Sequence, residues 1–442
     1  MRKRIIILAA LAAGLGLAAG AMPAASAATS TGSRSAGQST AVDFTSIPGG
    51  PKDVGIQVKT NAVVGTQCGK TLADSSKYAA KGITTVGCLE RATVPVSGQV
   101  PKISASAAGG NTVWCQSDPT NEWWVTRTTG CVYNEQVNYT QYNTQTGAES
   151  GSATIMFSDS IVLNTSSSQF TETNYVTMVN EDNVPELLVT YSGGCNSLCV
   201  VLDPTAEDNA VLTLGSTVSG NTTYSDAPFA QSLDVTDLAA TLSITPPGGN
   251  LVSPATINDP ASIRCDNGLA VSTTTGCIYP QVTPTVGFSL SSTGSTAVID
   301  GWAMINEQAH WGYYGNGQPL TRITNSATGD SNRAAICGNF VSLYTNDSCE
   351  EFPFASTYQS YGYGKKCSKD GTCPGDSCAQ VRAVNTNGQW SINYLGTVTL
   401  AEPCVRGHAD ITSQNRQGGT LSSFYQQNRV MDADPYWVSI SS

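Results

Sequence analysis

The sequence predicts a mainly β N-terminal region, sandwich-like and antiparallel, followed by a small α+β module, both rich in disulfides. Three observations lead to this fold class. Between residues 111 and 256, short alternating apolar runs rich in Thr and Val recur about every 8–12 residues, which is typical of an antiparallel sandwich. Helical periodicity is convincing only toward the C-terminus. The 14 cysteines are an even number, which in an exported protein indicates seven disulfides.

The first residues have the pattern of a secretion signal. A basic segment, Arg2-Lys3-Arg4, precedes an apolar run from Ile5 to Ala21, and the small residues Ala25-Ser26-Ala27 follow. We expect cleavage after Ala27 and a secreted, extracellular protein. A retained membrane anchor is the alternative, but the run is short against the ~20 residues that a bilayer span needs.

Composition divides the rest of the chain into three parts. Residues 28–109 begin with a stretch rich in Ser, Thr, Gly and Ala, so we expect a flexible lead or a removable pro-segment. Residues 110–260 form the β-rich domain, and the Pro246-Pro-Gly-Gly-Asn250 segment marks its end. Residues 261–442 form the C-terminal module, with helical patterns at Trp302–Trp311 and Leu421–Val430.

The net charge of −11 is unevenly distributed along the chain. Residues 301–442 hold nine Lys and Arg against eleven Asp and Glu, so the acidity belongs mainly to the N-terminal region. A nearly neutral module can bind a polyanion through a local basic face, without steering by a strong overall field.

Cysteine spacing predicts five local disulfides. Four further cysteines allow three pairings that the sequence leaves open, and a zinc site is the alternative for them. The predicted pairs are Cys68 with Cys88, Cys115 with Cys131, Cys195 with Cys199, Cys265 with Cys277, and Cys337 with Cys349; the remaining cysteines are Cys367, Cys373, Cys378 and Cys404.

One internal similarity is visible. Thr128–Tyr133 recurs as Thr274–Tyr279, each copy following a cysteine. We interpret it as a recurring disulfide-closed hairpin, with a shared binding site as the alternative. Trp123 and Trp124 beside the first copy are more typical of a core than of a sugar-stacking platform. The platform would make a cell-wall or matrix polysaccharide a partner of the β-rich region.

The C-terminal module offers few catalytic options. Only His310 and His408 are present, and no Gly-x-Ser-x-Gly or His-Glu-x-x-His pattern occurs, which argues against a serine hydrolase or a zincin. The prominent feature is Glu350-Glu351, between Cys349 and a Phe-Pro-Phe segment. Adjacent carboxylates on an extended chain point to opposite faces. A carboxylate can act as a base for water or as a ligand for Mg²⁺, Mn²⁺ or Ca²⁺, although such pairs also occur on solvated surfaces.

The segment Ser348–Tyr358 resembles the acidic-Glu-aromatic-Pro signature of the secreted NucA/NucB deoxyribonucleases. A second segment, Ser413–Gly419, is similar to the Asn-centred, Gly-containing stretch that opens the helix of that family. The ending Phe424–Asp434 also matches, and Ala309-His310 and Pro319–Arg322 resemble upstream segments. The resemblance covers about residues 262–442, and nothing comparable reaches residues 28–260.

This resemblance implies a ββα-metal type core with two strands and a helix. It implies a first strand carrying the acidic motif, a second strand at roughly Ala409–Thr412, and a helix starting near Asn415. Glu350 then matches the base that activates water, and Glu351 matches the second acid, as a catalytic residue or metal ligand. Asn415 would hold one divalent cation, Mg²⁺ or Mn²⁺, with Ca²⁺ as an alternative; its competing role is a helix cap.

The substrate implied by the resemblance is DNA. Arg416 is placed to contact a phosphate bidentately, and His408, His310 and Arg429 are further candidate contacts. Surface or structural roles are the alternatives for these side chains. Glu350 stands where members of the family typically carry Asp, and a shift of the carboxylate by about an ångström can cost ~100-fold in rate.

The sequence therefore predicts a secreted, divalent-metal-dependent endonuclease that hydrolyses the phosphodiester bonds of extracellular DNA. Two alternatives remain open. One is a catalytically impaired, nuclease-like protein that binds a surface or matrix, and the other is a secreted antibacterial nuclease toxin.

Overall fold

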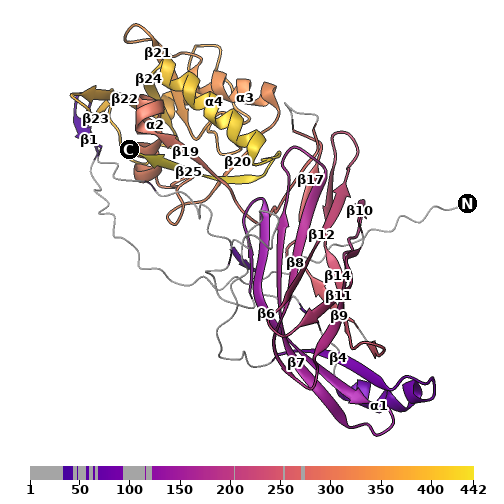
Figure 1. Ribbon diagram of the computed structural model, residues 1–442. Coiled ribbons are helices and arrows are strands. Elements are labelled where there is room, and N and C mark those ends of the chain that lie inside the picture. The colour runs from indigo at the N-terminus through magenta and orange to yellow at the C-terminus, as the bar shows by residue number, and fades with distance from the viewer. Residues whose placement is uncertain are drawn as a thin grey trace, which may run out of the picture.

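The computed structural model describes residues 33–42, 47, 56–58, 63–64, 68–92, 115, 122–203, 205–251, 254–269 and 274–442. An elongated β-rich part lies below a compact part that holds three of the four α-helices (Figure 1). The expected signal segment and its cleavage site after Ala27 lie outside the described residues. No helix among the described residues is long and apolar enough to cross a membrane.

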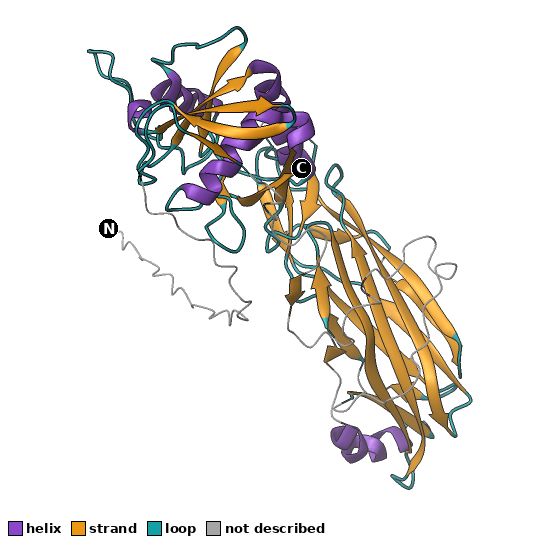
Figure 2. Cartoon of the chain, turned by 90° about the vertical axis from the view of Figure 1, so that its left-hand side faces the viewer, coloured by secondary structure: helices purple, strands orange, loops and turns teal. Residues whose placement is uncertain are grey.

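Two antiparallel sheets build the β-rich part, which confirms the predicted mainly β region (Figure 2). Side chains from both sheets belong to one hydrophobic core, in which Phe157, Val176, Tyr191 and Leu242 are fully buried. The first sheet contains β2 (Ile56–Val58), β4 (Thr85–Arg91), β5 (Trp123–Val125), β6 (Thr129–Asn143), β7 (Glu149–Val162), β8 (Gln169–Asp182), β10 (Cys199–Val201), β12 (Thr217–Asp226) and β15 (Asn250–Leu251). The second contains β3 (Val63–Val64), β9 (Glu186–Ser192), β11 (Thr205–Thr213), β14 (Ala239–Thr245) and β16 (Ala255–Asn258).

The β-rich part continues beyond residue 260, where the sequence placed its end. Strands β13 (Leu233–Thr236), β17 (Ile263–Asp266) and β18 (Gly276–Ile278) form a further small sheet. Cys265 and Cys277 lie opposite each other on β17 and β18 and are bonded, so the second copy of the internal similarity is the expected disulfide-closed strand pair. Trp123, beside the first copy, is 1% exposed, which agrees with its expected place in a core. A single helix, α1 (Cys68–Ala79), packs against β4.

The C-terminal part is a five-stranded sheet with helices packed against it. The sheet has the order β1-β23-β22-β24-β21, so β21 is an edge strand. Its elements are β1 (Ser39–Ala41), α2 (Leu290–Asn306), α3 (Ser326–Cys337), β21 (Asp347–Phe352), the 3-10 turn η2 (Pro374–Ser377), β22 (Ala379–Thr386), β23 (Gln389–Tyr394), β24 (Val405–Asp410) and α4 (Ile411–Gln427). A small second sheet contains β19 (Thr285–Ser289), β20 (Leu320–Thr321) and β25 (Pro435–Ser441).

Helix α2 is the central helix of this part, and its position differs from the expected helix at 302–311. It packs against β24, β22 and α4, and every residue from Thr293 to Met304 is buried. A helix enclosed on several sides is apolar all round, so it lacks the one-sided periodicity that identifies a helix in a sequence.

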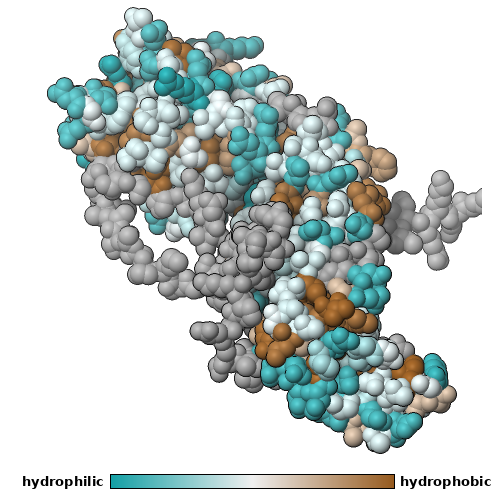
Figure 3. Space-filling view, viewed as in Figure 1, coloured by the Kyte–Doolittle hydropathy of each residue, from teal (hydrophilic) through white to brown (hydrophobic). Residues whose placement is uncertain are grey.

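Figure 3 shows a mainly hydrophilic or neutral surface over the C-terminal part in this view.

The lead segment is not wholly flexible, which corrects the expectation for residues 28–109. Strand β1 pairs with β23, Arg34 bridges to Val398, and Ile47 bridges to Ile440. These contacts join the start of the described chain to the C-terminal sheet. Backbone pairing at a sheet edge needs few apolar side chains, so a composition rich in Ser and Thr did not reveal it.

Seven disulfides are present, and they include all five predicted pairs. The other four cysteines form Cys367–Cys373 and Cys378–Cys404, so their thiols do not offer a zinc site. This number of disulfides is typical of proteins that fold in an oxidising compartment.

Buried ion pairs join the two parts. Arg429, at the end of α4, is fully buried, and its Nη2 lies 2.5 Å from Oδ1 of Asp266 on β17. Arg264 of β17 reaches back, with its Nη2 2.8 Å from Oδ2 of Asp434. Arg127 donates to the backbone oxygens of Asn428 and Arg429. Arg429 therefore links the two parts. Its buried side chain is not accessible to a DNA substrate, so the prediction that it contacts DNA is wrong.

Replacing Arg429 with Met should destabilise the protein strongly. The substitution keeps an apolar side chain but removes the close partner of Asp266 and leaves only Nε of Arg264, at 3.6 Å. Breaking a buried ion pair typically costs about 3–5 kcal/mol. The free energy of unfolding, measured by urea denaturation, tests this. The matched control is Arg416→Met on the exposed face of α4, expected within about 0.5 kcal/mol of wild type. Equal effects of the two substitutions would contradict the assignment.

Candidate active site

The acidic motif lies on an antiparallel strand pair that leads directly into a helix. Glu350 of β21 lies opposite Gly407 of β24, and Glu351 lies opposite Arg406. Helix α4 begins at Ile411, immediately after β24. The strand and the helix both start earlier than the sequence suggested. The helix begins at Ile411 because Asp410 caps it and accepts a hydrogen bond from the backbone N–H of Thr412 at 2.8 Å.

Glu350 faces helix α2 across a very close contact. A Cβ added to Gly407 would lie 2.6 Å from the side chain of Ile299, so only glycine fits between β24 and α2. The next residue of α2 is Asp300, whose charge acts directly on Glu350. Asp300 is fully buried and Glu350 is 4% exposed. Two carboxylates from different elements are thus brought together inside the protein.

Two amide side chains from α4 complete this cluster. Gln417 donates a hydrogen bond to Oδ2 of Asp300. Gln414 donates to the backbone oxygen of Cys349 and accepts from the hydroxyl of Ser348, and it also bonds to Glu350. Oδ1 of Asp300 is buried and has no hydrogen-bond partner. We call Asp300, Glu350, Gln414 and Gln417 the acidic site.

Burial governs the protonation of the acidic site. Burial first, and then the charges of Asp300 and Glu351, raise the pKa of Glu350 well above its usual range. Burial likewise raises the pKa of Asp300, although the bond from Gln417 opposes this shift. A site of this kind favours an added positive charge, supplied by a proton or by a cation.

Glu351 points to the opposite face of the sheet, as alternation along a strand requires. Its Oε1 lies 2.9 Å from Nε of Arg333 on α3, and the Arg333 side chain is 61% exposed. Burial raises the pKa of Glu351, and the charge of Arg333 opposes that shift. Among the described residues, the one metal-compatible group of His, Cys, Asp or Glu atoms found is Cys337, Cys349 and Glu351, but the two sulfurs are bonded to each other.

The two histidines lie away from the acidic site. His408 is 6% exposed on the same sheet face as Glu351, with Nδ1 2.7 Å from Oδ2 of Asp347 and its ring 4.3 Å from that of Phe340. His310 lies in the turn after α2, where its Nδ1 is 2.8 Å from the backbone oxygen of Met304. Both side chains are held by structural hydrogen bonds.

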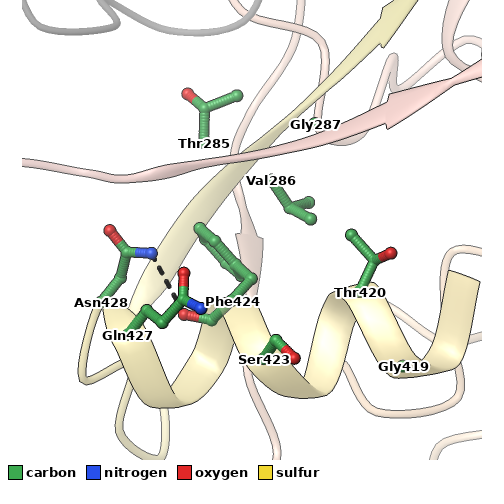
Figure 4. A pocket seen from close by; sticks show the side chains of 9 residues that line it. All are labelled: Thr285, Val286, Gly287, Gly419, Thr420, Ser423, Phe424, Gln427 and Asn428. Carbon is green, nitrogen blue, oxygen red and sulfur yellow. Dashed lines mark hydrogen bonds between the residues drawn. The ribbon is translucent and has the colours of Figure 1, made fainter.

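Asn415 and Arg416 are exposed on α4, whereas Gln417 is buried. Gln414 and Gln417 occupy the inward positions that the sequence analysis gave to Asn415. Nη1 of Arg416 lies 3.3 Å from the backbone oxygen of Ser292. A groove of about 540 Å³ lies between β19 and α4 (Figure 4). It is lined by Thr285, Val286, Gly287, Gly419, Thr420, Ser423, Phe424, Gln427 and Asn428, so its lining is uncharged.

Glu350 was predicted from the sequence, whereas Asp300, Gln414 and Gln417 were not. Asp300 carried a usable signal, because it is the one charged residue within the apolar run Ala297–Met304. A charge within a buried helix requires a partner or a function. The two glutamines carried no such signal, since their inward positions depend on where α4 starts.

No protein-family model, curated protein or solved structure matches this chain. The chemistry of the residues themselves therefore carries the functional argument.

Asp300→Asn should stabilise the protein at alkaline pH in the absence of divalent cations. A carboxyl whose pKa is raised by folding stabilises the fold below its unfolded pKa, and this contribution is lost as the pH rises through the folded value. The neutral isostere avoids that loss, so we expect a gain of about 1–4 kcal/mol at pH 8. Below pH ~4 the Asp300 carboxyl is protonated in the folded chain and largely protonated in the unfolded chain, so the gain should disappear.

Thermal unfolding across this pH range, in chelator, measures the effect. Asp330→Asn, an exposed acid on α3, is the control and should leave the profile unchanged. If Asp300→Asn is less stable than wild type at pH 8, Asp300 is not an uncompensated buried charge.

Proposed function

We propose that the protein is a secreted, divalent-cation-dependent endonuclease that hydrolyses phosphodiester bonds of extracellular DNA. The observation that carries the proposal is the pairing of Glu350 with Asp300 beneath the start of α4. The unit β21–β24–α4 has the strand-strand-helix order of a ββα-metal core, and the residues of the NucA/NucB-like signature lie on its first strand. The seven disulfides and the expected signal segment support an extracellular location.

The residues of the acidic site fit a hard divalent cation such as Mg²⁺ or Mn²⁺. Asp300 offers a buried oxygen, Oδ1, without a partner, and the side-chain amide of Gln417 is hydrogen-bonded to its other oxygen, Oδ2. Carboxylate and amide oxygens are the ligands that these cations prefer. We assign Asp300 and Gln417 as the residues that would hold the ion, in place of Asn415. A bound cation would stabilise negative charge on the phosphate and the leaving oxygen.

Glu350 is the proposed general base. Its raised pKa brings the carboxylate closer to the operating pH, where a base accepts a proton from water most effectively. The hydrogen bond from Gln414 orients the carboxylate, which lies on β21, an edge strand of the sheet. Members of the NucA/NucB family typically carry Asp at the position of Glu350. We propose that the longer Glu side chain is accommodated here by Asp300, which lies on α2.

Arg333 and Arg416 are the proposed phosphate contacts. Arg333 has an exposed side chain beside the acidic motif, and Arg416 has one on the outer face of α4. Only a few cations are involved, so we expect a shallow dependence of DNA binding on salt. A non-cleaving nuclease-like binder is the second candidate, and the 4% exposure of Glu350 is the observation that favours it.

Cleavage of plasmid DNA by the purified full chain tests the proposal. Wild type should cut in Mg²⁺ or Mn²⁺ and stop in chelator, and Glu350→Gln should lose at least ~100-fold in rate because the base is gone. Asp330→Asn should keep wild-type activity. If no chelator-sensitive cleavage occurs between pH 5 and 9 while DNA is still bound, the protein is the non-cleaving binder.

A second pair of substitutions separates the two possible cation sites. Gln417→Ala should reduce activity and raise the Mg²⁺ concentration needed for half-maximal rate, whereas Asn415→Ala should change neither by more than about 3-fold. The opposite pattern would move the cation to the outer face of α4.

A further inference from the structure

The core of the β-sandwich contains a cluster of polar side chains where apolar ones are expected. Asp159 on β7, Glu172 and Asn174 on β8, and Thr222 on β12 are all at most 2% exposed. They share the inner face of their strands with core residues such as Phe157. A buried polar side chain is costly unless it is bonded. This cluster therefore needs a physical explanation.

The strand register brings these side chains together. Asp159 lies directly opposite Asn174, and Glu172 lies directly opposite Thr222. Glu172 precedes Asn174 by two residues, so it shares the inner face of β8 and is a diagonal neighbour of Asp159. Gly220 of β12 lies opposite Asn174 and leaves space beside the amide.

Most polar atoms of the cluster have no hydrogen-bond partner. Both oxygens of Asp159, both amide atoms of Asn174 and the hydroxyl of Thr222 are buried without a hydrogen bond of normal geometry. Asp159 lies next to Glu172, and Thr222 lies next to Tyr224. Glu172 accepts hydrogen bonds from Tyr191 at 2.8 Å and Tyr224 at 2.5 Å. The tyrosines orient Glu172 but add no positive charge.

The cluster also lacks a compensating cation. Among the described residues, no ion pair is found for Asp159 or Glu172, and a third buried carboxylate, Asp259, adds to the repulsion. Buried carboxylates without a cation favour an added positive charge, either a shared proton or a metal cation.

We propose that Asp159, Glu172, Asn174 and Thr222 form a buried Ca²⁺ site that ties together β7, β8 and β12. The donors are all oxygens, from carboxylates, an amide and a hydroxyl, which is the ligand chemistry of Ca²⁺ and not of zinc or copper. Carboxylates that bind through one or two oxygens suit the flexible, six- to eight-fold coordination of Ca²⁺. A shared proton would link Asp159 with Glu172 but would leave both amide atoms of Asn174 unbonded.

This site is separate from the acidic site beside α4 and has a different role. An ion enclosed between two sheets cannot exchange without opening the sandwich, so its binding is coupled to folding. The β-rich part would then depend on extracellular Ca²⁺ for its stability, independently of whether the C-terminal part cuts DNA.

Thermal unfolding of the full chain, stripped with chelator and then titrated with CaCl₂ or MgCl₂, tests the proposal. In wild type, Ca²⁺ at about 100-fold over its dissociation constant should raise the unfolding midpoint by at least about 5 °C, and Mg²⁺ should raise it much less. Elemental analysis of dialysed protein should find Ca²⁺ bound at about one equivalent above that of Asp159→Asn.

Three variants locate the effect. Asp159→Asn, an isosteric change, should abolish the Ca²⁺-dependent shift. Glu149→Gln, an exposed acid on the same strand, should keep it, and Glu350→Gln should keep it as well. A wild-type midpoint that does not respond to Ca²⁺, or a full response in Asp159→Asn, would overturn the site. If Asp159→Asn does not fold, the Ca²⁺ content and midpoint of wild type and Glu149→Gln decide.

Discussion

The close packing of helix α2 on strand β24 is the constraint on which the acidic site depends. Gly407 lets Ile299 approach the sheet, and this contact sets the depth of α2. At that depth Asp300 acts on Glu350, and Gln417 of α4 reaches Asp300. A larger residue at 407 would separate the helix from the strand, and with it the two carboxylates. The chemistry of the site is therefore a consequence of helix-on-sheet packing as much as of the acidic motif itself.

The buried carboxylates of the protein fall into two groups, those bonded to an arginine and those without a cation. At the junction between its two parts, Asp266 and Asp434 are bonded to arginines, so each charge is compensated and serves structure. Asp300 with Glu350, and Asp159 with Glu172, have no such partner among the described residues. Buried carboxylates without a protein cation are costly, and a protein retains such groups mainly where they bind something or react. This contrast separates the two proposed cation sites from the bonded carboxylates at the junction.

Features that depend on residues close together in the sequence could be predicted, whereas features that depend on distant residues could not. Period-two alternation and cysteine spacing depend on near neighbours, so the β-rich region and five disulfides were predicted. The opposite facing of Glu350 and Glu351 followed from strand geometry in the same way. The partnership of Asp300 with Glu350 depends on a tertiary contact across 50 positions, and the inward turn of Gln417 depends on the start of α4 set by Asp410. Arg429 was misread for the same reason, because its partner Asp266 lies in the other part of the chain.

The most direct test of the central claim, that Asp300 and Glu350 form a cation-dependent active site, is a crystal soaked with Mn²⁺ and measured for anomalous scattering. The account predicts a peak within about 2.5 Å of a carboxylate oxygen of Asp300, beside Glu350 and Gln417. A peak at Asn415 on the outer face of α4, or no peak near Asp300 at saturating Mn²⁺, would contradict it.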